Sequence, residues 1–188
     1  MSFSAEKINK DDMNQILDRT TSWIENCDTK ASVVLGGLGV AFSIMLATDF
    51  IGYVTNVFKG ILENINFFSV AFIIIAVLSL GAIIFGCFFL VLVVVPKTNP
   101  QIFKSKDVVS DSLIFFSSIG KNKSVEQYKE KLIAYSEKDL IDDICSQIYI
   151  CSLICTQKFR NYKIGLLCTV FGFVVFAVLI IVGTFVAG

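Results

Sequence analysis

The chain has 188 residues, of which 55% are hydrophobic and 17% are charged, with a mean hydropathy of +0.74. Soluble domains average about 25% charged residues, so this composition excludes an ordinary soluble fold and an intrinsically disordered chain. Its 16 Lys and Arg balance 16 Asp and Glu, which gives no reason to expect a nucleic-acid binder. Because the chain has no His, Ser-His-Asp and Cys-His catalysis are excluded. We therefore expect a membrane protein that is not an enzyme, with no bound metal and no resident cofactor.

Residues 1–30 predict an amphipathic helix, because their apolar side chains recur every three or four positions. Asp11 or Asp12 suits the N-cap of this helix. No proline interrupts the chain before residues 31–50, which are apolar enough to cross a bilayer. We expect the amphipathic helix to run without a break into this first transmembrane segment.

Residues 51–66 also place apolar side chains at helical spacing, with polar residues between them. This pattern indicates either a short helix in the outer membrane interface or an extension of the first span. Residues 67–95 contain no charged residue and exceed the roughly 20 residues that a spanning helix needs. The second transmembrane helix ends before Pro96, because proline lacks the N–H that a continuing helix requires.

Residues 96–163 hold most of the Lys and Arg of the chain, and residues 164–188 form a third uncharged span. Ser124 and Gln127 have the spacing of a capping box, which predicts a helix start. The apolar stripe that follows slips near Ser136–Asp139, so one long helix and two helices both remain open. The predicted fold is an all-α integral membrane protein with three transmembrane helices and a cytoplasmic helical bundle. The positive-inside rule places the N-terminus and residues 96–163 in the cytoplasm and the C-terminus outside.

Charged residues gather where the first and third spans meet the inner leaflet. Asp28 and Lys30 lie at the start of the first span, and Lys158 and Arg160 lie just before the third. Lys and Arg in such a layer can bind a phosphate, and a carboxylate can accept a hydrogen bond from a base or ribose. The alternative is ordinary inner-leaflet charge with one structural salt bridge.

Three further patterns have both a functional and a structural interpretation. Asp139, Asp142 and Asp143 share one helix face and can bind a metal or act as acid and base, but we expect a solvated face. Phe115 and Phe116 can stack on a base, although core packing is favoured. Small residues line the spans and allow close packing within one chain or between chains. Among these small residues are Gly39, Ser43 and Ala47 of the first span.

The segment Trp23-Ile-Glu-Asn-Cys-Asp28-Thr-Lys30-Ala-Ser32 resembles the W-I-x-x-x-D-x-K-A-S start of the first span in Pycsar effectors of the PycTM type. Leu113-Ile-Phe-Phe116 is similar to their short L-x-F-F segment. Gln147-Ile-Tyr-Ile-Cys-Ser152, followed by Lys158-Phe-Arg-Asn-Tyr162, resembles their last cytoplasmic helix. The resemblance covers roughly residues 10–180, in the same order and with the same placement of spans.

This resemblance implies a bacterial antiphage effector in the inner membrane. In such systems a partner cyclase makes cyclic UMP or cyclic CMP, which the effector binds on its cytoplasmic side before it impairs the membrane and arrests growth or kills the cell. A homo-oligomer is expected, because a single phosphate contact is too weak to move the membrane equilibrium alone. The alternatives are a ligand-independent membrane adaptor and a constitutive small channel.

A cyclic mononucleotide needs cations for its phosphate, polar partners for the base edge and an apolar platform. We expect the cations to be Lys30, Lys158 and Arg160. The expected polar partners of the base are Asp28, Gln147 and Ser152, and the expected apolar platform is Phe116 or Tyr149.

Overall fold

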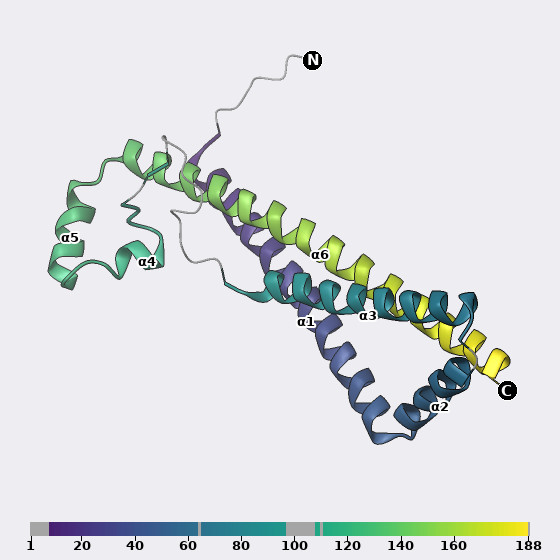
Figure 1. Ribbon diagram of the computed structural model, residues 1–188. Helices are drawn as coiled ribbons and strands as arrows, with labels where there is room; N and C mark the ends of the chain where they lie inside the picture. Colours follow the sequence, from purple (N-terminus) through teal and green to yellow (C-terminus); the bar gives the residue numbers. More distant parts are fainter. Residues whose placement is uncertain (1–7, 64, 97–107, 110, 188) are drawn as a thin grey trace, which may run out of the picture. The chain divides into compact units, whose positions relative to one another are not determined.

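The computed structural model describes residues 8–63, 65–96, 108–109 and 111–187, and within these residues all regular structure is α-helical. The helices follow one another along the chain as labelled in Figure 1. Their bounds are α1 Lys10–Ala47, α2 Phe50–Glu63, α3 Phe67–Val94, α4 Phe116–Ile119, α5 Val125–Ala134 and α6 Glu137–Ala187. Three of them, α1, α3 and α6, are long and apolar enough to cross a membrane. The protein is therefore an all-α membrane protein.

The chain forms two compact units, which are described separately below. Unit 1 contains the chain up to Asn26 together with Pro96–Lys158, and unit 2 contains Cys27–Val95 and Phe159–Gly188. Helices α1 and α6 each begin in unit 1 and end in unit 2. The amphipathic segment thus continues into the first apolar segment without a break, as predicted.

Helix α1 is capped by Asn9 and not by Asp11 or Asp12, so our N-cap prediction was wrong. Asn9 Oδ1 accepts from the backbone N–H of Asp12 at 2.9 Å, and Asp12 Oδ2 accepts from the backbone N–H of Asn9 at 2.9 Å. This reciprocal pair is a capping box, in which Asp12 takes the third helical position. The helix begins two residues earlier than an Asp11 cap would allow, because Lys10 is already helical.

The helical stripe after residue 124 forms two helices. Ser124 caps α5 and accepts from the backbone N–H of Gln127 at 3.2 Å, as the capping-box spacing predicted. Tyr135 then has an extended backbone and ends α5. Ser136 and Asp139 form the next reciprocal cap: Asp139 Oδ2 accepts from the Ser136 backbone N–H at 3.0 Å, and Ser136 Oγ accepts from the Asp139 backbone N–H at 3.2 Å. A fresh cap at Ser136 explains the slip in the apolar stripe.

In unit 2, α2 is a separate short helix that packs on α3 and α6 and does not extend α1. Val57 and Ile61 of α2 are buried in one cluster with Phe72 of α3 and Leu179 of α6. The Ser69 hydroxyl at the start of α3 donates to the carbonyl of Ile61 at 2.9 Å.

Glycines bring α3 and α6 into close contact within unit 2. A Cβ atom on Gly86 would lie 2.6 Å from the backbone N of Thr169, and one on Gly165 would lie 2.9 Å from the carbonyl O of Gly86. Such distances are shorter than any side chain accepts, so only glycine allows this approach. By contrast, a Cβ atom on Gly37 or Gly39 of α1 would meet nothing within 4 Å. Small residues therefore serve packing within the chain on α3 and α6 but not at these two positions of α1.

Candidate functional site

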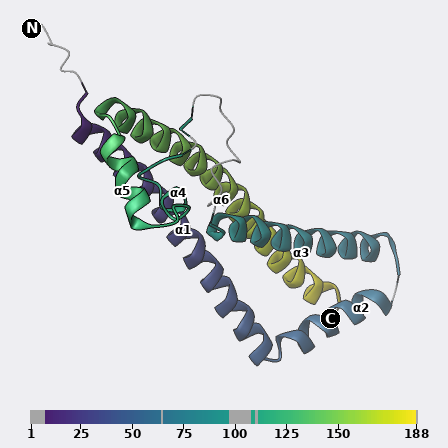
Figure 2. The ribbon, with the colours of Figure 1, turned by 90° about the vertical axis from the view of Figure 1, so that its left-hand side faces the viewer.

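Unit 1 contains a pocket of about 480 Å³ between the beginnings of α1 and α6. The two helix beginnings run side by side in both ribbon views (Figures 1 and 2). The segment just before α4 closes the third side. Its lining residues are Lys10, Asn14, Leu17, Asp18 and Thr21 of α1; Ile114 and Phe115; and Leu140, Ile144, Gln147 and Cys151 of α6. The volume falls within the roughly 300–1,000 Å³ of small-molecule sites.

Helix α1 gives the pocket a row of polar side chains. Lys10, Asn14 and Asp18 are four residues apart, so they follow one another along one face over about 12 Å. None of the three side chains makes a hydrogen bond or ion pair within the described residues. A cation, a carboxamide and a carboxylate are therefore available to a ligand along the length of the pocket.

Helix α6 adds a carboxamide from the opposite side. Gln147 lines the pocket with only 6% of its surface exposed. Its side-chain amide has no hydrogen-bond partner among the residues that the structure describes. Among the described residues, the enclosed side-chain atoms that lack a partner are Asp143 Oδ1 and Thr169 Oγ1, so the Gln147 amide is not enclosed and is accessible to a ligand in the pocket.

The remaining walls are mostly apolar. Ile144 is buried, and the Phe115 ring is half-buried and available as a flat surface. Aromatic faces stack on bases and other planar groups. The pocket thus combines an apolar platform with a few polar groups, which is the usual composition of a site for a small polar ligand.

The wall that carries Phe115 is tied to α6 by hydrogen bonds. The backbone N–H of Phe115 donates to Ser112 Oγ at 3.0 Å, and the Ser112 hydroxyl donates to Asp143 Oδ2 at 3.0 Å. The backbone N–H of Leu113 donates to the same carboxylate oxygen at 2.9 Å. Tyr128 of α5 holds the segment from the other side, because its hydroxyl donates to the Leu113 carbonyl at 2.9 Å.

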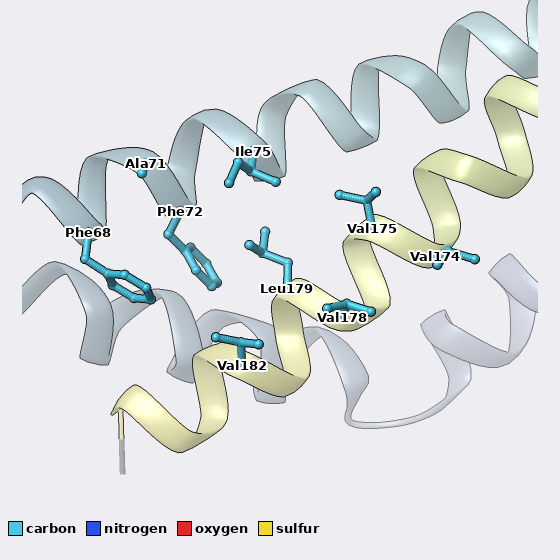
Figure 3. A pocket seen from close by; sticks show the side chains of 9 residues that line it. All are labelled: Phe68, Ala71, Phe72, Ile75, Val174, Val175, Val178, Leu179 and Val182. Atoms are coloured by element: carbon cyan, nitrogen blue, oxygen red, sulfur yellow. The ribbon is translucent and has the colours of Figure 1, made fainter.

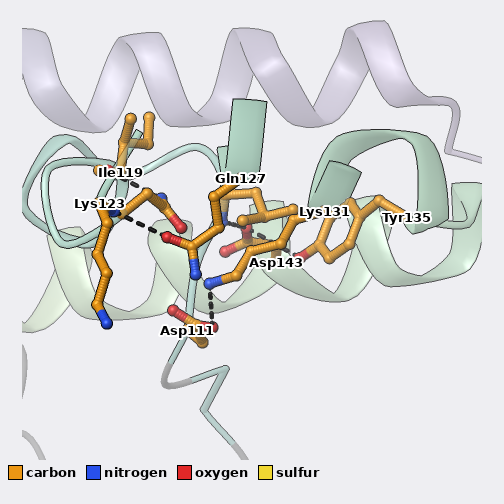
Figure 4. A network of polar contacts seen from close by, with 9 residues as sticks. Asp111, Ile119, Lys123, Gln127, Lys131, Tyr135 and Asp143 are labelled. Carbon is orange, nitrogen blue, oxygen red and sulfur yellow. Dashed lines mark hydrogen bonds and ion pairs between the residues drawn. The ribbon is translucent and has the colours of Figure 1, made fainter. Parts of the chain in front are cut away.

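Asp143 is the centre of this network, and Figure 4 shows it with Tyr135, whose hydroxyl donates to Oδ2 at 3.1 Å. The carboxylate is fully buried, and its Oδ1 has no partner among the described residues. Burial and the Asp143 charge raise the pKa of the Tyr135 hydroxyl to about 12. Our expectation of a solvated face was therefore wrong for Asp143, because the segment before α4 folds over it.

The neighbouring carboxylates do stay at the surface. Asp142 is exposed, and Asp139 is an exposed helix cap whose pKa is lowered by hydrogen bonds from Ser136. Lys131 pairs with Asp111 at 3.1 Å, and both side chains are exposed (Figure 4). Within the described residues, no group of His, Cys, Asp and Glu side chains has a geometry that would hold a metal ion.

The predicted ligand residues of α6 lie on different faces of that helix. With 3.6 residues per turn, Gln147 and Lys158 are roughly 20° apart, and both are buried. Tyr149 and Arg160 share another face and are exposed. Ser152 is exposed as well, and its hydroxyl donates to the Ile148 carbonyl at 2.8 Å. One face of α6 therefore does not present all five residues to a single ligand.

The other predicted residues lie outside the unit 1 pocket. Phe116 belongs to unit 1 but is 64% exposed and does not line the pocket, whereas its neighbour Phe115 does. Asp28, Lys30 and Arg160 belong to unit 2, where Lys30 and Arg160 are exposed. Lys158 is 2% exposed. Both Lys158 and Asp28 interact with other groups of the chain. Gln147 alone among the predicted residues lines the pocket.

Sequence reasoning missed Lys10, Asn14 and Asp18. Their spacing of four residues on a predicted helix was a usable signal, since it aligns three polar groups on one face. That signal is common on solvated helices, and only the segment before α4 turns this face into a pocket wall.

Unit 2 has a hollow of another kind, of about 360 Å³, between α3 and α6. Figure 3 shows that all its lining side chains are apolar, including Phe72 and Leu179. A charged ligand would lose its hydration there without compensation, so this hollow does not suit a nucleotide.

Known proteins resemble this chain along most of its length. The family model described as the Pycsar effector protein domain, PycTM, matches residues 12–184. The chain is 30% identical over 189 residues to the Pycsar effector protein GmPycTM of Gulbenkiania mobilis, covering 90% of each chain. It is 28% identical over 150 residues to the Pycsar effector protein EcPycTM of Escherichia coli, covering 79% of this chain and 76% of the relative. No solved structure matches. Because the family model covers nearly the whole chain, this membrane protein belongs to the PycTM family of Pycsar effector proteins.

Proposed function

We propose that this chain is a non-enzymatic antiphage effector of the bacterial inner membrane, activated by a cyclic pyrimidine mononucleotide. Cyclic UMP and cyclic CMP are the foremost ligands. A nucleotide cyclase is the functional partner through its product, and the bilayer is the target. The N-terminus and unit 1 lie in the cytoplasm and the C-terminus lies outside, in accordance with the distribution of Lys and Arg.

The observation that carries this proposal is the pocket of unit 1. Its size, its apolar platform and its unpaired polar side chains match the needs of a single nucleotide. Lys10 suits the phosphate, Gln147 suits the base edge and Phe115 suits the flat ring. Lys30 and Arg160, which were predicted together with Asp28 and Lys158, remain the second candidates for the phosphate, and both belong to unit 2.

Continuous helices connect the pocket of unit 1 to the membrane-spanning segments of unit 2. The helices that form two walls of the pocket, α1 and α6, continue into the apolar segments of unit 2. A ligand that prefers one arrangement of these helices shifts the population of membrane states. Moving that equilibrium from 1:99 to 99:1 requires about 5.5 kcal/mol of differential affinity. A homo-oligomer with several sites supplies this more readily than one site.

Calorimetry on detergent-purified full-length protein tests the sensing. Cyclic UMP or cyclic CMP should bind with saturable heat, whereas the linear 5′-monophosphates should bind more weakly. If cyclic UMP, cyclic CMP, cyclic AMP and cyclic GMP all fail to bind, the proposal that the protein senses a cyclic nucleotide is wrong.

Two rival functions make different predictions. A ligand-independent adaptor would not be toxic when the protein is co-expressed with a pyrimidine nucleotide cyclase, whereas the proposed effector would arrest growth. A constitutive small channel would conduct in liposomes without nucleotide, whereas the proposed effector would stay closed.

A further inference from the structure

We propose that Gln147 is the specificity-determining residue of the pocket and pairs with the hydrogen-bonding edge of the pyrimidine base. This inference rests on the proposed function, since it assigns one role within that site. It goes beyond that function by naming the atoms of the base with which Gln147 forms hydrogen bonds.

The Gln147 side chain lines the pocket and is available to a ligand. It is 6% exposed, it lines the pocket, and it has no hydrogen-bond partner among the described residues. The amide is not among the enclosed, unpaired side-chain atoms of the described residues, so it is open to a ligand in the pocket. Two other polar side chains of unit 1 are already paired: the Ser112 hydroxyl donates to Asp143 and the Ser146 hydroxyl donates to the Asp142 carbonyl.

The carboxamide of Gln147 is complementary to the hydrogen-bonding edge of a pyrimidine base. A carboxamide offers one acceptor and two donors side by side. In uracil, N3–H is a donor next to the O4 acceptor, so the Gln147 oxygen accepts from N3–H while its nitrogen donates to O4. In cytosine the pattern is reversed, and a flipped carboxamide matches N3 and N4–H₂. One side chain therefore serves both pyrimidines, and a bidentate pair of this kind is worth about 10- to 100-fold in affinity.

The other groups of the pocket lie on different walls from Gln147 or flank it with apolar surface. Lys10, the cation among the lining residues, lies on α1, whereas Gln147 lies on α6. A mononucleotide carries its phosphate and its base edge on different parts of the molecule, so a cation and a carboxamide on different walls of one pocket can contact both. Phe115 and the apolar residues of α6 lie on the remaining walls, where the flat faces of the base need contact.

The test pairs a change in the ligand with a change in the residue. Binding of cyclic UMP and of its N3-methyl derivative is measured by calorimetry on wild-type protein and on Gln147→Met. Methylation removes the N3–H donor, so wild-type protein should bind the methyl derivative about 10- to 100-fold more weakly. Gln147→Met should bind both ligands within about threefold of each other, because the pairing is already lost. For cyclic CMP the matching derivative is N4,N4-dimethyl.

Thermal unfolding distinguishes a role of Gln147 in binding the base from a role in stabilising the fold. Met has nearly the volume of Gln and no group that needs a partner, so Gln147→Met should not lower the thermal midpoint of the ligand-free protein. It should, however, remove most of the rise in that midpoint that cyclic UMP causes in wild-type protein. Gln15→Met is the matched control, because Gln15 is exposed on α1 and does not line the pocket.

The results distinguish an error in the role of Gln147 from an error in the proposed function. If wild-type protein binds cyclic UMP and its N3-methyl derivative equally, or if Gln147→Met still discriminates between them, the role of Gln147 is wrong and the proposed function stands. If wild-type protein binds no cyclic nucleotide at all, both are wrong.

Discussion

Tyr135 donates a hydrogen bond of 3.1 Å to Asp143 Oδ2, and this bond joins the end of α5 to the first half of α6. The same oxygen accepts from the Ser112 hydroxyl and the Leu113 backbone. A single buried carboxylate oxygen therefore connects both helices with the segment that carries Phe115 of the pocket.

Replacing Asp143 should destabilise unit 1. Asp143→Asn keeps the shape but removes the charge from three hydrogen bonds, and bonds to charged groups contribute about 1.5–3 kcal/mol each. We expect a loss of about 2 kcal/mol, which corresponds to a thermal midpoint about 4–8 °C lower for a chain of this size. Asp142→Asn is the matched control at the next position, where the side chain is exposed and a change below about 0.5 kcal/mol is expected. Equal midpoints for the two variants would contradict the network.

The partial burial of Tyr135 and its contact with Asp143 give a pH dependence. Because the pKa of folded Tyr135 is raised to about 12, above the unfolded value of about 10, the stabilisation is complete below pH 10. It is lost as the pH rises from about 10 to about 12. The difference in ultraviolet absorbance between wild-type protein and Tyr135→Phe, followed against pH, isolates this phenol. A midpoint near pH 10 would show that Tyr135 does not contact Asp143.

The glycines of α3 give a test of the helix contact in unit 2. Gly86→Ala places a methyl group 2.6 Å from the backbone N of Thr169, and such overpacking costs about 1–3 kcal/mol. Gly81→Ala, five residues earlier on the same helix, meets nothing within 4 Å and should be neutral or stabilising through helix propensity. Thermal unfolding in one detergent compares the two variants. Tolerance of alanine at both positions would contradict the close contact of α3 with α6.

The two candidate phosphate sites can be distinguished by their cations. If the nucleotide binds in the pocket, Lys10→Ala should weaken cyclic UMP binding about 3- to 10-fold, since Lys10 is exposed and its contact with the phosphate is partly screened. Lys30→Ala and Arg160→Ala should then leave the affinity unchanged. Calorimetry with the reverse pattern would assign the phosphate to Lys30 and Arg160 and contradict binding in the pocket.

Much of the fold was predictable because it depends on local signals. Long uncharged apolar runs predict spanning helices, and capping residues such as Ser124 mark a helix start. The change from α5 to α6 was visible as a slip in the apolar stripe near Ser136, although the sequence left one helix and two helices open.

The site was less predictable, because it depends on contacts between distant segments. Asp143 looks like a solvated residue when α6 is considered alone, and its burial requires Ser112 and Leu113, which lie about 30 positions earlier. Lys10 and Asn14 likewise look like an ordinary polar helix face. Gln147 was predicted through its place in the family resemblance, whereas its position in the pocket wall is visible only in three dimensions.

The most direct test of the account is dye release from proteoliposomes that contain the full-length protein, with nucleotide added on the side that unit 1 faces. We expect cyclic UMP or cyclic CMP to trigger release from wild-type protein and the Gln15→Met control, and to trigger much less from Gln147→Met at the same concentration. Release without nucleotide, or none despite saturating nucleotide, would contradict the claim that a ligand bound in unit 1 changes the membrane.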